Sequence, residues 1–277
     1  MVGVNKKPMK IKEVLDAYGG FVRYFGTTEL MQNMVAYVDP KKPLQILACC
    51  GGGDQSLTFL GHCQKGTEVY AFDLNPAQLF VLACKAVYLE DTKLKVFDPT
   101  FDRISRLHLG RIRKLPRNVQ KITKLVNLRG NKNIDLKEDF REKFGFEIDS
   151  GLFDFKPQSL HWVKDRRFMA AIRKQLHHLN FIREDVLYIS DWFAKGSLDV
   201  IYLSDIPLHN AIPYYLERLN TLILRLKPGG LVMGNTEDLN ELDRNPTIME
   251  ILLNYQDLFG LKLVGQRKKS LCLRRNQ

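Results

Sequence analysis

The sequence predicts a three-layer α/β/α sandwich built around a mostly parallel sheet. An apolar run at 44–50 leads through a glycine turn into a helix, which is the order of a βα unit. A second strand at 69–72 is followed by another helical pattern. After a long interruption, a further strand at 199–203 precedes a helix, a glycine turn and another strand. Alternation of strands and helices is typical of a parallel sheet covered by helices on both faces.

The glycine turn of the first unit is the first candidate binding site. Gly51 to Gly53 follow the strand directly, and a helix is expected from Ser56. Glycines allow a ligand to approach the backbone closely, and the N-terminus of a helix offers unpaired N–H groups to an anion. The candidate cofactor-binding residues here are Cys50, Gly51, Gly52, Gly53 and Gln55.

The second unit places an acid where a ribose would lie. Asp73 ends the strand, and an acid in this position accepts hydrogen bonds from ribose hydroxyls. Pro76 suits the first turn of the helix that follows. Further candidates for cofactor binding are Leu74, Asn75 and Gln78. Together the two units indicate an adenosine-type ligand, either NAD or S-adenosylmethionine; the alternative is an ordinary α/β turn with a surface aspartate.

Polar residues after two later strands extend the candidate site. Asp185 is expected to accept from an adenine amino group, with Val186 presenting its backbone to the ring and Asp191 as a competing acid. Ser204 and Asp205 follow the strand at 199–203, so they are expected to face the ligand crevice.

Four segments carry a resemblance to a known family. They are GGGDQSLTFL at 51–60, AFDLNPAQLFVLACKA at 71–86, DVIYLSDI at 199–206 and LKPGGLV at 226–232. The chain resembles the S-adenosylmethionine-dependent 3-amino-3-carboxypropyl transferases of betaine-lipid synthesis and their wider uncharacterised family. DLNPAQ is the specific part, since methyltransferases in general share the rest. The resemblance implies S-adenosylmethionine as cofactor and a seven-stranded methyltransferase-type sheet, which the hairpin expected in the tail would close.

The reaction that the resemblance implies is transfer of the 3-amino-3-carboxypropyl group to a small-molecule or lipid acceptor. If the acceptor is a hydroxyl or an amine, a base must take its proton. The candidates are Asp205, His209 and Tyr214, and a structural role for His209 stays open. Methyl transfer is one alternative. Another is a non-catalytic cofactor-binding protein, because Ala48 stands where many methyltransferases carry an acid.

The domain organisation follows from where the βα pattern breaks. We expect an N-terminal helical segment over 1–40 and a cofactor-binding domain over 41–277, interrupted by a mostly helical cap at about 91–175. The first part of this insertion combines basic residues with apolar ones at helical spacing.

The net charge of +11 and the basic insertion favour acidic partners. We expect an acidic small-molecule or lipid acceptor, with peripheral contact to an anionic membrane as a second prediction; a solvated basic surface is the alternative. Nucleic acid is not favoured, because the insertion lacks regular aromatic interleaving.

Cysteine usage and the N-terminus predict a cytoplasmic protein. The five cysteines form no CxxC pair, the first residues contain no apolar signal core, and no apolar run reaches the roughly 20 residues of a membrane span. No metal site is expected, because the pair His177 and His178 has no further ligand at suitable spacing. The oligomeric state stays open.

Overall fold

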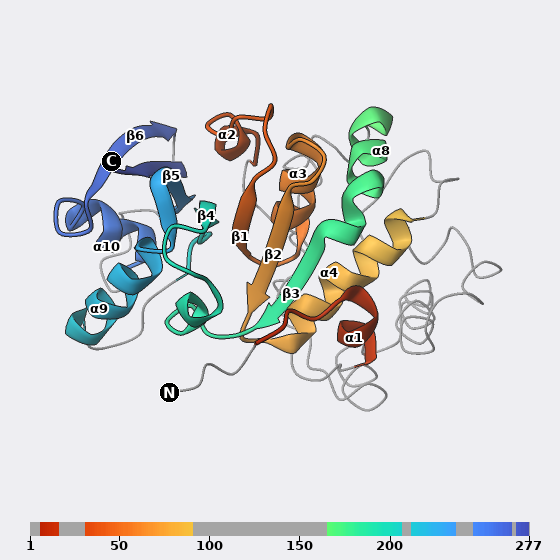
Figure 1. The fold of residues 1–277 in the computed structure, drawn as a ribbon, viewed down its shortest axis with the longest axis horizontal. Helices are drawn as coiled ribbons and strands as arrows, with labels where there is room; N and C mark the ends of the chain where they lie inside the picture. The colour runs from red at the N-terminus through yellow and green to blue at the C-terminus, as the bar shows by residue number, and fades with distance from the viewer. Residues whose placement is uncertain are drawn as a thin grey trace, which may run out of the picture.

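A computed structural model describes residues 6–16, 31–90, 165–206, 212–236, 246–267 and 270–276. These residues form a single seven-stranded sheet with helices on both faces (Figure 1). The strands are β1 Gln45–Cys49, β2 Glu68–Asp73, β3 Leu179–Arg183, β4 Leu198–Tyr202, β5 Leu226–Asn235, β6 Leu261–Arg267 and β7 Ser270–Arg275.

The strand order confirms the predicted fold class. Along the sheet the order is β3-β2-β1-β4-β5-β7-β6, with β1 to β5 parallel and β7 antiparallel to both of its neighbours. The order of the first five strands is also that of a dinucleotide-binding sheet. Insertion of the antiparallel β7 between β5 and β6 distinguishes the methyltransferase-type sheet, and it comes from the hairpin that the tail predicts.

The sheet separates two hydrophobic cores. On β1, Ile46 and Ala48 point into one core and Leu47 into the other, as the alternation of a strand requires. The helices of the first core are α1 Ile11–Asp16, α2 Met31–Val35, α3 Asp54–His62, α4 Pro76–Leu89 and α8 Arg166–Gln175. Those of the second core are α9 Ile212–Ile223 and α10 Ile248–Asn254. The buried apolar residues of both cores make this a three-layer sandwich.

The direction of winding changes between β1 and β4. The helices that follow β1 and β2 pack on one face, whereas α9, which follows β4, packs on the other. β1 and β4 are nevertheless neighbours in the sheet. Ligands of open α/β sheets bind outside the carboxyl ends of the strands at such a switch point. The fold therefore points to the residues that follow β1 and β4.

The helical periodicity of residues 168–179 predicts a helix that continues to Leu179, whereas α8 ends earlier. Asp165 caps its start by accepting from the backbone of Arg167 and Phe168, and the helix ends at Gln175. A short 3-10 turn then leads into β3, because Leu179 pairs with Val69 of β2. Pairing with β2 therefore places Leu179 in a strand, although helical periodicity alone would include it in the helix.

Tight packing joins α8 to α3. A Cβ at Gly61 would lie 2.2 Å from the ring of Phe168 and 2.8 Å from Ile172, so only glycine permits this approach. The amide of Gln175 donates to the carbonyl groups of Leu60 and Cys63, at 2.5 and 3.1 Å. Although α8 lies within the predicted insertion, it packs directly on the helical layer of the sandwich.

The N-terminal residues lie along the β3 edge of the sheet. Met9 forms an antiparallel bridge with Phe181, and Val14 of α1 is buried in the first core. Most of the predicted insertion, residues 91–164, lies outside the described residues. The boundaries of the 1–40 segment and of the insertion therefore stay predictions. Within the described ranges, no helix is long and apolar enough to cross a membrane.

Candidate functional site

The glycine turn after β1 has the backbone geometry that requires glycine. Gly51 and Gly53 have φ angles of 46° and 85°, a region that side chains other than glycine rarely adopt. The Gly53 N–H donates to the Cys50 carbonyl at 2.6 Å, which closes the turn. A Cβ at Gly53 would also lie 2.7 Å from the Leu82 side chain, so α4 packs directly beneath the turn.

A buried ion pair holds the turn in place. Lys85 of α4 donates from Nζ to both carboxylate oxygens of Asp54 at 2.9 Å and to the Gly52 carbonyl at 2.7 Å. The two side chains are 1% and 0% exposed. Since Asp54 is the first residue of α3, its carboxylate also lies at the positive end of the helix dipole. One lysine therefore joins α4, the glycine turn and the start of α3.

Three of the predicted cofactor contacts support the turn from below. The amide of Gln78 donates to the Gly51 carbonyl at 2.6 Å, and the Cys50 thiol donates to the Gln78 carbonyl at 3.5 Å. Burial, followed by the nearby charge of Asp73, raises the pKa of the Cys50 thiol well above its ordinary value. Gln55 is also buried, with its amide beside Gly51. The hydrogen bonds of Cys50 and Gln78 stabilise the turn, and direct contact of these three residues with a cofactor stays a prediction.

The end of β2 presents a carboxylate beside an exposed apolar side chain. Asp73 accepts from the backbone N–H of Asn75 at 2.9 Å, which fixes the orientation of its carboxylate. Leu74, between them, is 60% exposed. An orientated carboxylate next to an apolar surface suits a ribose attached to a flat, apolar ring.

The end of β3 lies beside the end of β2 and carries a second orientated carboxylate. Asp73 pairs with Arg183 in the sheet, so Asp185 follows only two residues beyond. Asp185 accepts from the backbone of Leu187 at 2.8 Å, and its carbonyl accepts from Tyr188 and Ile189. These bonds fix the loop that carries the next residue.

That next residue is Val186, which packs partly buried against the second core. The competing acid Asp191 is exposed in the short 3-10 helix η7, Ile189–Trp192. Of the two acids, Asp185 is the one that directly follows β3.

The end of β4 contains a residue in a strained conformation. Ser204 has a φ of 55°, in the left-handed region, and its carbonyl accepts from the Asn235 N–H at 2.8 Å. A Cβ at Gly234 would lie 2.5 Å from that carbonyl oxygen, so β5 approaches closely there. The Ser204 hydroxyl donates to the exposed carboxylate of Asp205 at 3.2 Å. Strain of this kind at a switch point is typical of functional sites.

The structure thus brings the candidates of four separate segments to one edge of the sheet. β1, β2, β3 and β4 are parallel neighbours, so the glycine turn, Asp73, Asp185 and Ser204 all follow carboxyl ends on the same side. Of the other proposed catalytic residues, His209 lies outside the described residues. Tyr214 belongs to α9, and its side chain is likewise outside the described part.

Asp54 and Lys85 are site residues that the sequence did not predict. A signal was present, because Lys85 lies within the apolar helix pattern of 79–87, and a buried lysine requires an anionic partner. Asp54, next to the glycine turn, is the anionic partner of Lys85.

Comparison with known proteins gives distant structural similarity. No protein-family model and no curated protein matches the chain. Among solved structures, 1,6-didemethyltoxoflavin-N1-methyltransferase of Burkholderia thailandensis, crystallised with its substrate and S-adenosylhomocysteine, is 12% identical, with a TM-score of 0.41 over 90% of this chain and 77% of that one. The N-methyltransferase NodS of Bradyrhizobium japonicum WM9, in complex with S-adenosylhomocysteine, is 10% identical, with a TM-score of 0.43 over 90% of this chain and 84% of that one. Magnesium protoporphyrin IX methyltransferase of Synechocystis PCC 6803, with bound S-adenosylmethionine, is 11% identical, with a TM-score of 0.41 over 89% of this chain and 76% of that one. The fold assignment above rests on the strand order of this chain.

Of the histidine pair at the opposite edge, His178 contacts a neighbouring strand of the sheet. His178 contacts the Glu68 carboxylate through Nδ1 at 2.6 Å, and Asn180 donates to the other oxygen of Glu68 at 2.7 Å. Among the described residues, no cluster of three or more metal-ligating side chains occurs.

Proposed function

We propose that the protein is an S-adenosylmethionine-dependent transferase. The observation that carries this proposal is the arrangement at the switch point of a methyltransferase-type sheet. A glycine turn held in place by a buried ion pair follows β1, and orientated carboxylates follow the neighbouring strands β2 and β3. An adenosine-bearing ligand needs this sequence of partners along one sheet edge.

The residues present fit the chemical groups of S-adenosylmethionine. Asp73 supplies the acceptor for the ribose hydroxyls, and Leu74 and Val186 supply apolar surface for the adenine ring. Asp185 supplies an acceptor for the adenine amino group. The turn from Gly51 to Gly53 brings backbone N–H groups and the start of α3 to the amino-acid end of the cofactor.

The protein contributes to the reaction by positioning the cofactor relative to the acceptor. When bound, S-adenosylmethionine supplies a sulfonium whose three attached carbons are all electrophilic. Which carbon reacts depends on which one lies in line with the acceptor at near-attack distance. The rigid turn and the fixed carboxylates hold the donor in one orientation. For the base that takes a proton from the acceptor we propose Asp205, which is exposed beside the strained Ser204.

Within this class we propose transfer of the 3-amino-3-carboxypropyl group. Support comes from the DLNPAQ segment at 73–78, the specific part of the resemblance to the transferases of betaine-lipid synthesis. Methyl transfer is the alternative, and the arrangement of the described residues accommodates it equally. In both reactions one S–C bond breaks as the acceptor's nucleophile bonds to the carbon, so the sulfur leaves as a neutral thioether.

For the acceptor we propose a small molecule or lipid with acidic character. The support is the net charge of +11 and the basic residues of 91–130, which lie outside the described part of the chain. Peripheral contact with an anionic membrane is part of the same proposal.

Product analysis tests the proposed reaction. The protein is incubated with S-adenosylmethionine and extracts of candidate acceptors, and the nucleoside product is identified by mass spectrometry. Methylthioadenosine is the expected product; S-adenosylhomocysteine would instead establish methyl transfer. Asp205→Asn should remove most of the turnover while leaving cofactor binding intact. If neither product accumulates although the cofactor binds, the protein is a non-catalytic binding protein.

A further inference from the structure

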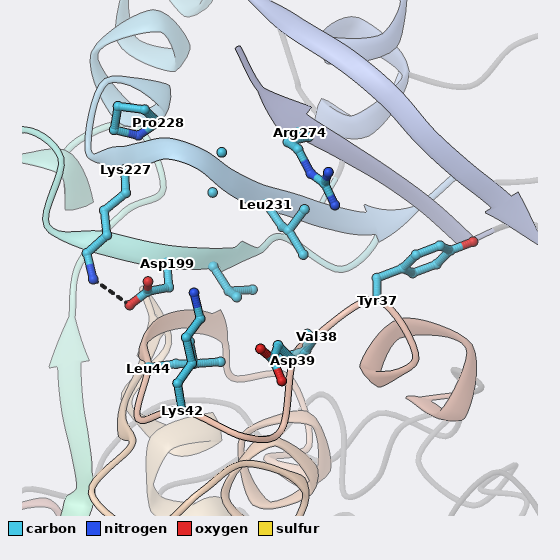
Figure 2. Close-up of a pocket in the computed structure, with 13 residues that line it drawn as sticks. Tyr37, Val38, Asp39, Lys42, Leu44, Asp199, Lys227, Pro228, Leu231 and Arg274 are labelled. Atoms are coloured by element: carbon cyan, nitrogen blue, oxygen red, sulfur yellow. Dashed lines mark hydrogen bonds and ion pairs between the residues drawn. The ribbon is translucent and has the colours of Figure 1, made fainter. Parts of the chain in front are cut away.

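A hollow at the opposite edge of the sheet carries a second proposal. It is a cavity of about 230 Å³ at the amino ends of β1, β4 and β5, away from the glycine turn. Figure 2 shows its walls: the loop from Tyr37 to Leu44 below, the Lys227–Gly230 segment of β5 above, and Arg274 of β7 reaching in from the side. The proposed transfer reaction takes place at the other edge, so the two sites are separate.

The wall contributed by β5 is a bulge. Leu198 pairs with Leu226 and Val200 pairs with Leu231, so the single residue Asp199 faces four residues of β5. Gly229 has a φ of 79°, which permits the turn. A Cβ at Gly230 would lie 2.9 Å from the Lys227 carbonyl and 3.1 Å from that of Asp199. The glycines therefore allow this wall to form.

The two carboxylates of the cavity are engaged by the protein itself. Asp199 accepts from the Gln45 N–H at 2.9 Å and from Lys227 Nζ at 2.8 Å (dashed in Figure 2). Asp39 accepts from the backbone N–H of Lys41 at 2.9 Å, which shapes the loop before β1. Lys227 balances the charge of Asp199, whereas the Asp39 carboxylate remains a negative charge in the cavity lining.

Two cations at the cavity are not used in this way. Lys42 and Arg274 line it from different elements, and within the described ranges neither side chain makes a hydrogen bond or ion pair. Both side chains are exposed, and in Figure 2 Lys42 points upward from the lower loop while Arg274 lies on the upper right, beside Leu231. The floor beside them is apolar, formed by Val200 and Leu231. The cavity therefore offers two cationic groups above an apolar floor.

We propose that this cavity binds the phosphate group of a small molecule. The planar guanidinium of Arg274 can donate two parallel hydrogen bonds to a phosphate, and Lys42 adds a point charge. Lys227 and Asp199 form an ion pair and together add little net charge to the cavity. The volume lies below the roughly 300 Å³ at which pockets for drug-sized ligands begin, so the occupant is a small phosphate ester or the phosphate of a lipid headgroup.

Titration with inorganic phosphate tests the proposal. Binding to the full chain is followed by two-dimensional NMR at constant ionic strength, with chloride replacing phosphate in the reference series. We expect saturable shifts at the amides of 37–44 and 227–231. The double variant Lys42→Met, Arg274→Met should bind at least tenfold more weakly, because each lost charged hydrogen bond is worth about a factor of ten or more.

The matched control is Lys41→Met, which removes an exposed charge next to the cavity without removing a lining residue. Its phosphate affinity should stay within twofold of the wild type. If Lys41→Met weakens phosphate binding as much as the double variant does, the loss reflects net charge alone and the proposal is overturned. Amide shifts that never saturate with phosphate would overturn it as well. If the double variant has a lowered unfolding midpoint, the single variant Lys42→Met carries the test.

Co-sedimentation with lipid vesicles identifies whether the bound phosphate belongs to a lipid or to a soluble molecule. Co-sedimentation with phosphatidic acid vesicles that is lost in the double variant and competed by inorganic phosphate assigns it to a lipid. Saturable phosphate binding without such sedimentation assigns it to a soluble ester. If neither inorganic phosphate nor these vesicles bind in a manner that depends on Lys42 and Arg274, the proposal is wrong.

Discussion

Replacing Lys85 with methionine should leave the Asp54 carboxylate buried without its cation. The two side chains are 1% and 0% exposed, so water cannot replace the lost partner. Removing one member of a buried pair costs about 3–5 kcal/mol, because an uncompensated charge remains. The Gly52 carbonyl loses its lysine donor as well. In chains of around this size each kcal/mol lowers the unfolding midpoint by about 2–4 °C, so the midpoint should fall by on the order of 10 °C.

Urea unfolding followed by circular dichroism measures this loss. Lys65→Met is the control, because Lys65 is exposed in a loop, and it should change the free energy of unfolding by less than about 0.5 kcal/mol. Adding Asp54→Asn to Lys85→Met removes the negative charge that Lys85 balanced and should recover part of the lost stability. A loss below about 1 kcal/mol for Lys85→Met, or no recovery in the double variant, would refute a buried ion pair under the glycine turn.

Three further predictions concern the thiols, the strained serine and the basic region. Burial raises the pKa of both Cys63 and Cys272 from 9.0 to about 12, so mass spectrometry should find neither thiol labelled at pH 8 until urea unfolds the chain. Since the folded state keeps protons that the unfolded chain releases above about pH 9, the free energy of unfolding should fall as the pH rises from there towards 12. Ser204→Gly should keep stability within about 1 kcal/mol, whereas Ser204→Val should destabilise the protein, because a β-branched residue fits the left-handed region poorly; equal unfolding midpoints would contradict this. Changing Arg111, Arg113 and Lys114 together to glutamate should weaken acceptor use and leave cofactor affinity unchanged, with an effect that fades as salt rises; unchanged acceptor kinetics would leave that cluster as a solvated surface.

The sequence predicts the parts of this site that depend on local pattern. A glycine triplet after an apolar run and an acid at the end of the next strand are local signals, and the structure places Gly51 and Asp73 at adjacent strand ends. The antiparallel tail hairpin was predictable for the same reason, since two short apolar strands flank polar residues.

Features that depend on contacts between distant segments were predicted less well. Gln55 and Gln78 have the right spacing for ligand contact, but only the packing of α4 under the turn shows that they are buried. The end of α8 at Gln175 depends on the pairing of Leu179 with β2, which helical periodicity cannot register. The Lys42–Arg274 cavity joins residues at the two ends of the chain, so only the sheet order brings them together.

Calorimetric titration of S-adenosylmethionine into the wild type and Asp73→Ala tests the central claim most directly. The wild type should bind the cofactor, and NAD at the same concentration should give no binding heat. Loss of the Asp73 carboxylate should cost about 1.5–3 kcal/mol, which corresponds to affinity about 10- to 150-fold weaker. Absence of binding to the wild type, equal binding of NAD, or unchanged affinity in Asp73→Ala would contradict a cofactor site at the carboxyl edge of β1 and β2.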